Sequence, residues 1–353
     1  MIELLTEHHL VALFGLLGGL CLGLAARLGR FCTLGAIEDA LYGGSTTRIR
    51  MWGVALGIAI LGSFGLMASG QLAAETTYYL SIRWMPLASI LGGLLFGYGM
   101  ALSGNCGYGA VARLGGGDLR SFVIVLVMGV STYVVLSGPL APLRDMAFPQ
   151  SAVTPGEPIP GIAHFLGAAT GLSANAIGMA LGLVLLGVSA ASRKLWKKPG
   201  QVFWSAVVGL GVIIGWAGTA WVARTGFEDL PVVSHSFAAP LGETILWFMT
   251  GSARPLSFAV GSVAGVWTGA FAGSLIKGHF RWEACEDPRE LRRQIVGAAL
   301  MGAGAVIALG CSIGQGLSAF SLLAFSAPVT FAAIFAGAAL GLRQLIMGFQ
   351  PAE

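Results

Sequence analysis

The sequence predicts an all-α integral membrane protein with about nine transmembrane helices, short re-entrant half-helices and two inverted, pseudo-symmetric halves. Three observations predict this fold class: a scarcity of charge, long charge-free runs, and a cysteine motif that recurs in an inverted setting. Charged residues make up 10% of the 353 residues, whereas soluble proteins carry about 25%. Hydrophobic residues make up 56%, and the mean hydropathy is +0.80. So few charges cannot coat a soluble protein of this size, and a net charge of +4 is too small to indicate nucleic-acid binding.

The charge-free runs give the expected helices in order. A helix needs about 20 apolar residues to cross the hydrocarbon layer. Eight runs reach or approach this length: Leu10–Ala26, Met51–Ala74, Trp84–Ala112, Ser121–Leu143, Phe165–Ser192, Pro199–Ala223, Pro255–Ile276 and Gln294–Leu342. The last run is long enough for two crossings, which makes nine in total. Such long continuous runs exclude a β-barrel, whose strands alternate over about ten residues.

The N-terminal run is expected to stay as a first helix over residues 10–29, because Glu3 and Glu7 stand where a signal peptide carries basic residues. The even-numbered loops are poor in basic residues, with Arg83, Arg144, Arg224 and Arg254. The odd-numbered loops carry most of them: Arg27, Arg30, Arg48, Arg50, Arg113, Arg120, Arg193, Lys194, Lys197, Lys198, Lys277, Arg281, Arg289, Arg292 and Arg293. Basic loops stay cytoplasmic, so we predict an inner (cytoplasmic) membrane protein with its N-terminus outside and its C-terminus, with Arg343, inside.

A Cys-x-x-Gly frame occurs three times, at Cys32–Gly35, Cys106–Gly109 and Cys311–Gly314. Cys106 follows the third expected helix and Cys311 the eighth, and this offset of five inverts the second copy. The frames therefore predict a first half over 1–145 and a second over 199–353. Residues 146–198 join them as an extracytoplasmic proline-rich loop, a linking helix and a basic loop. Transporters with inverted repeats bind their substrate near the midplane between the halves.

The repeat is degenerate at one position. The second-half counterpart of Cys32 is expected within residues 235–242, a stretch without cysteine. The glycine-rich frames are expected to form re-entrant turns, because irregular backbone at membrane depth requires a protein or water partner. On this topology Cys106 approaches from the cytoplasmic side and Cys311 from the outside. The candidate substrate-binding residues are Cys32, Cys106, Cys311, Gly35, Asn105, Gly107, Gly109, Ser312, Gly314 and Gln315.

Other readings of the cysteines and glycines have less support. Cys21 lies in mid-helix and is expected to be a buried apolar residue, and Cys285, in a charged loop, is expected to be an incidental surface thiol. A disulfide among the frames conflicts with their placement on opposite faces. The histidines lie far from the frames, so no metal is expected. The glycine clusters lack the context of a nucleotide-binding loop, so no cofactor is expected.

These stretches resemble the YeeE/YedE family of membrane proteins. The resemblance rests on Gly29–Ala36, on Ser103–Gly109 and above all on Leu291–Ser321, and it covers nearly the whole chain. It implies an all-helical fold with two pseudo-symmetric halves and the uptake of inorganic sulfur compounds, chiefly thiosulfate. It also implies that Cys32, Cys106 and Cys311 are functional. Family members often work beside a small soluble cytoplasmic sulfurtransferase, which is therefore an expected partner together with membrane lipid.

Physical chemistry is compatible with that function. A dianion cannot enter hydrocarbon unaided, and it needs donors that replace water. Backbone N–H groups at half-helix N-termini provide such donors, and protonated thiols add weak donors without negative charge. We expect a relay from Cys311 to Cys106 and then to Cys32, with no arginine in the three frames. Two alternatives stay open: a membrane-embedded sulfur-transfer or thiol redox enzyme that uses the same cysteines covalently, and a small-ion channel.

Overall fold

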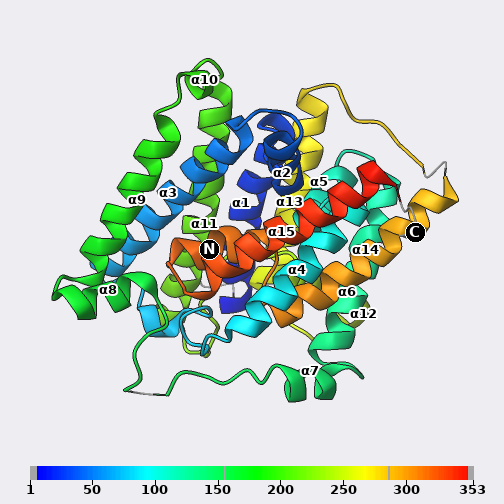
Figure 1. Cartoon of the computed structure of the whole chain (residues 1–353). Helices are drawn as coiled ribbons and strands as arrows, with labels where there is room; N and C mark the ends of the chain where they lie inside the picture. Colours follow the sequence, from blue (N-terminus) through cyan, green and yellow to red (C-terminus); the bar gives the residue numbers. More distant parts are fainter. Residues whose placement is uncertain (1–5, 155, 285–286, 349–353) are drawn as a thin grey trace.

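The computed structural model describes residues 6–154, 156–284 and 287–348 and consists of packed helices joined by turns and loops (Figure 1). Cys285 lies outside the described residues. Within them, β-pairing is limited to isolated bridges such as the one between Thr77 and Val232. The all-α expectation is therefore confirmed for the described part of the chain.

In the described part of the chain, nine helices of 17 residues or more form the body of the protein. They are α1 (Glu7–Leu28), α3 (Thr47–Ala68), α4 (Pro86–Ser103), α6 (Leu119–Leu136), α9 (Ala174–Ala190), α11 (Pro199–Thr225), α13 (Phe258–Ile276), α14 (Pro288–Ile307) and α15 (Ser326–Met347). Shorter elements connect them: α2 (Thr33–Leu41), η2 (Ala74–Thr76), α5 (Gly107–Leu114), α7 (Ala141–Ala147), α8 (Ile162–Thr170), α10 (Arg193–Trp196), α12 (Ala239–Thr250) and η3 (Gly314–Ala319).

Seven of the described helices are long and apolar enough to cross a membrane. The other two predicted crossings correspond to α9 and α14. Helix α9 has 17 residues, and α14 carries four charged residues in its first two turns (Arg289, Glu290, Arg292 and Arg293). A multi-pass membrane protein is thus established, whereas nine crossings stay a prediction.

Glycines set the spacing of the central helices. Helix α1 packs along α13 and α11, and α4 packs along α15 and α14. A Cβ atom added to Gly97 of α4 would overlap the Ile334 carbonyl oxygen of α15, and one added to Gly23 of α1 would overlap the Val266 carbonyl oxygen of α13. Contact of this kind requires glycine, because backbone meets backbone with no room for a side chain.

The same chain reversal precedes each frame. The residue two positions before the cysteine has a left-handed backbone: Arg30 (φ 56°), Gly104 (φ 72°) and Leu309 (φ 59°). Each reversal ends a long helix and starts a short one, namely α2, α5 and the helical segment 312–321 that contains η3. Arginine and leucine adopt this backbone at a cost of about 1–2 kcal/mol, so the surrounding packing must compensate.

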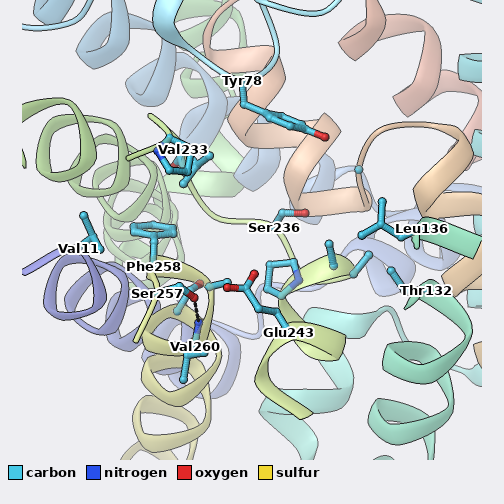
Figure 2. A pocket seen from close by; sticks show the side chains of 18 of the residues that line it. Val11, Tyr78, Thr132, Leu136, Val233, Ser236, Glu243, Ser257, Phe258 and Val260 are labelled. Atoms are coloured by element: carbon cyan, nitrogen blue, oxygen red, sulfur yellow. Dashed lines mark hydrogen bonds between the residues drawn. The ribbon is translucent and has the colours of Figure 1, made fainter. Parts of the chain in front are cut away.

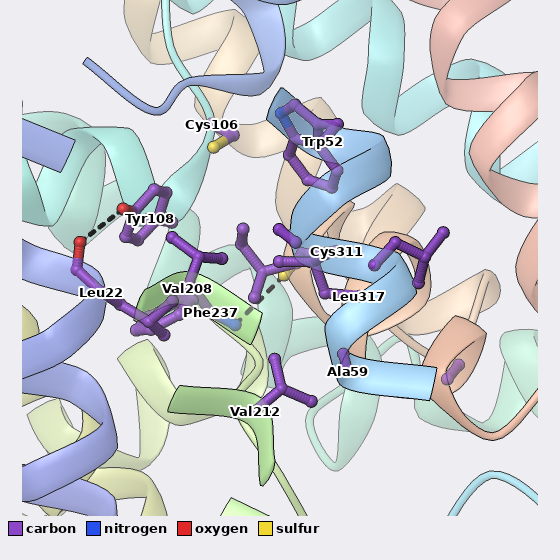
Figure 3. Close-up of a cluster of buried hydrophobic side chains, with 14 of the residues drawn as sticks. Leu22, Trp52, Ala59, Cys106, Tyr108, Val208, Val212, Phe237, Cys311 and Leu317 are labelled. Atoms are coloured by element: carbon purple, nitrogen blue, oxygen red, sulfur yellow. Dashed lines mark hydrogen bonds between the residues drawn. The ribbon is translucent and has the colours of Figure 1, made fainter. Parts of the chain in front are cut away.

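The short helices meet in the middle of the molecule. The main apolar core includes Trp216, Tyr108, Phe237 and two cysteines, Cys106 and Cys311, all of them 1% exposed or less. Figure 3 shows Tyr108, Phe237, Cys106 and Cys311 together with Trp52 of α3 and Val208 of α11. The three frames therefore lie inside the protein and not along its lipid-facing surface.

The backbone contact at Gly97 predicts a measurable cost for a single methyl group. Gly97→Ala should lower the stability of the purified protein in detergent by about 1–3 kcal/mol, because the added Cβ has no space. Gly65→Ala on α3 is the matched control, since a Cβ there meets nothing within 4 Å, and alanine favours the helix by up to about 1 kcal/mol. Equal thermal unfolding midpoints for the two variants would contradict the packing described.

Candidate functional site

Each framed cysteine accepts a hydrogen bond from the glycine of its own frame. The backbone N–H of Gly35 donates to Cys32 Sγ and that of Gly109 to Cys106 Sγ, both at 3.5 Å. The third frame has the same contact, from the Gly314 N–H to Cys311 Sγ at 3.4 Å. A thiol in this position stands at the positive end of a short helix, and its own proton remains available to a ligand.

The three frames converge in space. Cys106 lies close enough to Cys32 on one side and to Cys311 on the other for electrostatic interaction. Cys311 Sγ also accepts the backbone N–H of Phe237 at 3.1 Å (Figure 3) and lies 3.7 Å from Ser236 Oγ. The stretch expected as the counterpart of Cys32 thus reaches the site. It brings the backbone N–H of Phe237 and the hydroxyl of Ser236 to Cys311.

A pair of buried hydroxyls closes the centre. Thr33 Oγ1 donates to Ser312 Oγ at 3.3 Å, and Cys106 lies within hydrogen-bonding reach of both. This bond ties the turn after α1 to the turn after α14. Sequence reasoning identified Ser312 but missed Thr33, although both residues directly follow the cysteine of their frame and this repetition was available as a signal.

Two cavities approach the centre from opposite sides of it. The Cys32 vestibule, of about 510 Å³, is lined by Cys32, Gly35, Gly104 and Gly109 together with several basic side chains. The Cys311 vestibule, of about 520 Å³, ends at Gly310, next to Cys311, and is lined there by Tyr79 and Ser236. Figure 2 shows Ser236 and Glu243 among the side chains that line this second vestibule, together with Tyr78 and Phe258.

The described structure is closed between the two vestibules. Cys106 lines neither cavity and is 1% exposed. Phe237 and Leu317 are fully buried in the same core. Passage of a ligand from one vestibule to the other therefore requires these side chains, or the Thr33–Ser312 bond, to move.

The remaining predicted residues have distinct places. A Cβ on Gly107 would overlap the Phe237 carbonyl oxygen, so this glycine allows close packing at the centre. Gln315 is occupied by the fold: its Nε2 donates to the Ala308 carbonyl oxygen at 2.9 Å, and its Oε1 accepts from Ser326 at 3.2 Å. Asn105 is buried, and its Oδ1 has no hydrogen-bond partner among the described residues.

Charged residues from outside the frames surround Cys32. No frame contains an arginine, as expected, yet Arg48 of α3 and Arg113 of α5 lie close enough to the Cys32 thiol to interact with it electrostatically. A Cβ on Gly35 would overlap Nη1 of Arg48. Lys277, just beyond α13, lines the same vestibule; its pKa is lowered by burial and then by the positive charges of Arg30 and Arg27. Sequence spacing held no signal for this cluster.

Cys21 lies half-buried on α1, and the four described cysteines are free thiols. Within residues 6–154, 156–284 and 287–348, no three His, Cys, Asp or Glu side chains come together as metal ligands.

The capping contacts predict different outcomes for two substitutions at one position. Cys106→Ala removes the acceptor of the Gly109 N–H and should destabilise the protein by about 1 kcal/mol, whereas Cys106→Ser, with a favoured N-cap side chain, should keep wild-type stability. Thermal unfolding in detergent measures both. A serine variant as unstable as the alanine variant would show that capping is not what Cys106 contributes to the fold.

Comparison with known proteins is consistent with this geometry. A family model described as "Sulphur transport" matches residues 28–340. The chain is 26% identical over 321 residues to the thiosulfate transporter TsuA of Escherichia coli, with 86% of each chain covered. It is 27% identical over 329 residues to the thiosulfate transporter TsuA of Spirochaeta thermophila, with 88% of this chain and 92% of the relative covered.

Proposed function

This chain belongs to the sulphur-transport (YeeE/YedE) family, and we propose that it is a permease that takes up thiosulfate or a similar inorganic sulfur anion. The observation that carries the proposal is the convergence of three Cys-x-x-Gly turns between two vestibules. The family match and the two relatives named as thiosulfate transporters support a transporter of sulfur anions over an enzyme.

The chemistry of the turns suits a small dianion. Burying such an ion without partners costs far more than a protein can supply, so the path must replace its water. At each turn the short-helix N-terminus provides backbone N–H groups and a favourable dipole. The thiol adds a weak donor and, while protonated, no repelling charge. Such donors hold an anion without the strength of an ion pair, which allows it to leave again.

The order of steps follows the order in space. The anion would enter the Cys311 vestibule, pass Cys106, and leave through the Cys32 vestibule. Support comes from the position of Cys106 between the other two cysteines and from the two cavities on either side of it. The anion takes the place of neighbouring hydroxyls at each thiol, so the Thr33–Ser312 bond opens during passage. No covalent cysteine intermediate is required.

The proposed topology has two inverted halves, 1–145 and 199–353, joined by 146–198. Helix contacts support it, because they occur in matching pairs. Helix α1 packs on α13 as α11 packs on α3, and α4 packs on α15 as α14 packs on α6. Helices α2 and α12 take equivalent places against α3 and α13. We place nine crossings in the inner membrane, with the N-terminus outside and the C-terminus inside, because the basic loops mark the cytoplasmic face.

Two partners complete the proposal. Large apolar side chains of α9, such as Leu183 and Val188, are exposed, which suits contact with membrane lipid. A small soluble sulfurtransferase on the cytoplasmic side is the partner that the family resemblance implies. It would receive the anion from the Cys32 vestibule.

Uptake into proteoliposomes tests the permease directly. Wild-type protein should take up labelled thiosulfate, and Cys32→Ser, Cys106→Ser and Cys311→Ser should each reduce uptake at least tenfold, because serine keeps the cap and removes the thiol. Cys21→Ser, a half-buried thiol outside the frames, is the control and should retain uptake. Unchanged uptake in all three framed variants would refute the assigned path.

Mass spectrometry distinguishes transport from covalent sulfur transfer. After incubation with thiosulfate, the intact mass of the permease should be unchanged. A persulfide on Cys106 or Cys311, formed when thiosulfate transfers its outer sulfur to the thiol and sulfite leaves, would instead support the enzyme alternative.

A further inference from the structure

The two vestibules differ sharply in charge. Among the described residues, five arginine or lysine side chains, one histidine and one carboxylate line the Cys32 vestibule: Arg27, Arg30, Arg48, Arg113, Lys277, His279 and Glu38. The Cys311 vestibule is nearly the same size, but its described lining has one arginine, Arg254, one carboxylate, Glu243, and His8. An anion therefore meets an almost neutral cavity at one end of the path and a strongly cationic cavity at the other.

Two arginines stand nearest to the thiol. Arg48 places its guanidinium against Gly35, the glycine whose N–H donates to Cys32 Sγ, and Arg48 Nε lies 3.3 Å from Asp39 Oδ2. Arg113 Nη2 donates to the Gly104 carbonyl oxygen at 3.2 Å. A guanidinium has five N–H donors, so these contacts leave several donors of each side chain for a ligand. They also hold the guanidinium of Arg48 against the Cys32 turn and that of Arg113 against the turn before Cys106.

Retention of basic loops in the cytoplasm explains why arginines occur at this face, but not why they line a cavity. Arg50, two residues from Arg48, is bonded to the Val188 carbonyl oxygen at 3.0 Å and does not line the vestibule. Arg27, by contrast, lines it, and its buried Nε has no hydrogen-bond partner among the described residues. Topology requires positive charge in the loop, whereas the geometry concentrates that charge around Cys32.

We propose that the Cys32 vestibule is a second anion-binding site, in which Arg48 and Arg113 hold a doubly charged sulfur oxyanion next to the Cys32 thiol. This inference rests on the proposed permease function and deepens it. Arg27, Arg30 and Lys277 add positive potential and raise the local concentration of anions. The site makes the path asymmetric: weak thiol and amide contacts carry the ion, and a cationic chamber retains it at the cytoplasmic end until it is handed on. Such a site sets where the anion waits and does not by itself drive accumulation.

Charged thiol reagents test the site without relying on transport. The purified protein in neutral-lipid nanodiscs is treated with an anionic (sulfonatoethyl) or a cationic (trimethylammonioethyl) methanethiosulfonate, and modification of Cys32 is followed by peptide mass spectrometry. Cys32 should react faster with the anionic reagent. Arg48→Gln and Arg113→Gln should each lower that rate by about fivefold, as expected for loss of one unit charge near 4 Å in water. Arg48→Lys and the matched control Arg50→Gln should stay near the wild-type rate.

A competition experiment identifies the ligand. Sulfate, an unreactive dianion of similar shape, should protect Cys32 from the anionic reagent at constant ionic strength, and the glutamine variants should need at least tenfold more of it. The basic side chains that would bind sulfate would also attract the phosphate headgroups of anionic lipids. Protection by phosphatidylglycerol in the nanodisc but not by sulfate would overturn the proposal in favour of a lipid site.

Three further outcomes test the second site and the permease function separately. Equal rates for the two reagents at wild-type Cys32 would overturn the proposal without any variant, even if a variant fails to fold. Normal thiosulfate uptake with charge-indifferent labelling would refute the second site alone. Charge-selective labelling with no uptake would refute the permease and leave an anion site in place.

Discussion

Everything at the centre of this molecule depends on satisfying backbone N–H groups where a helix is broken inside an apolar core. A long helix that stops and restarts at membrane depth exposes amides with no water nearby, and each unpaired group costs several kcal/mol. Here a cysteine accepts one of the free amides in the first turn of each short helix, that of the glycine three residues on. The interaction that permits the break also puts a thiol at the positive end of a helix. The capping contact and the proposed binding chemistry are therefore provided by the same atom.

The closeness of the turns depends on the packing around them. Glycines on α1 and α4 let neighbouring helices approach until backbone touches backbone, and this leaves room for three turns in one small volume. Left-handed residues at Arg30 and Leu309 are tolerated because these contacts compensate their strain. The Thr33–Ser312 bond then joins the two sides. The result is a closed centre between two open cavities, which is the arrangement expected of a transporter between its outward-open and inward-open states.

The distribution of charge distinguishes the two ends of this nearly symmetric arrangement of turns. The three turns offer similar donors, so they do not distinguish one end of the path from the other. The basic residues do, because they surround Cys32 and are scarce around Ser236 and Tyr79. In the topology and path that we propose, the basic residues that keep this face in the cytoplasm are also the residues that meet an anion leaving the thiols.

The sequence by itself determined the all-helical membrane class, the order of the long helices and the three cysteine turns, since composition, charge-free length and a repeated frame are local properties of the chain. It also singled out residues 235–242 as the predicted counterpart of the Cys32 frame, although not the backbone N–H that Phe237 donates to Cys311. Only the tertiary structure decided that Gln315 is used by the fold, that Thr33 meets Ser312, and that Arg48 and Arg113 flank Cys32. These contacts join residues far apart in sequence, and no spacing rule predicts them, because their geometry is set by how closely glycine lets the helices approach.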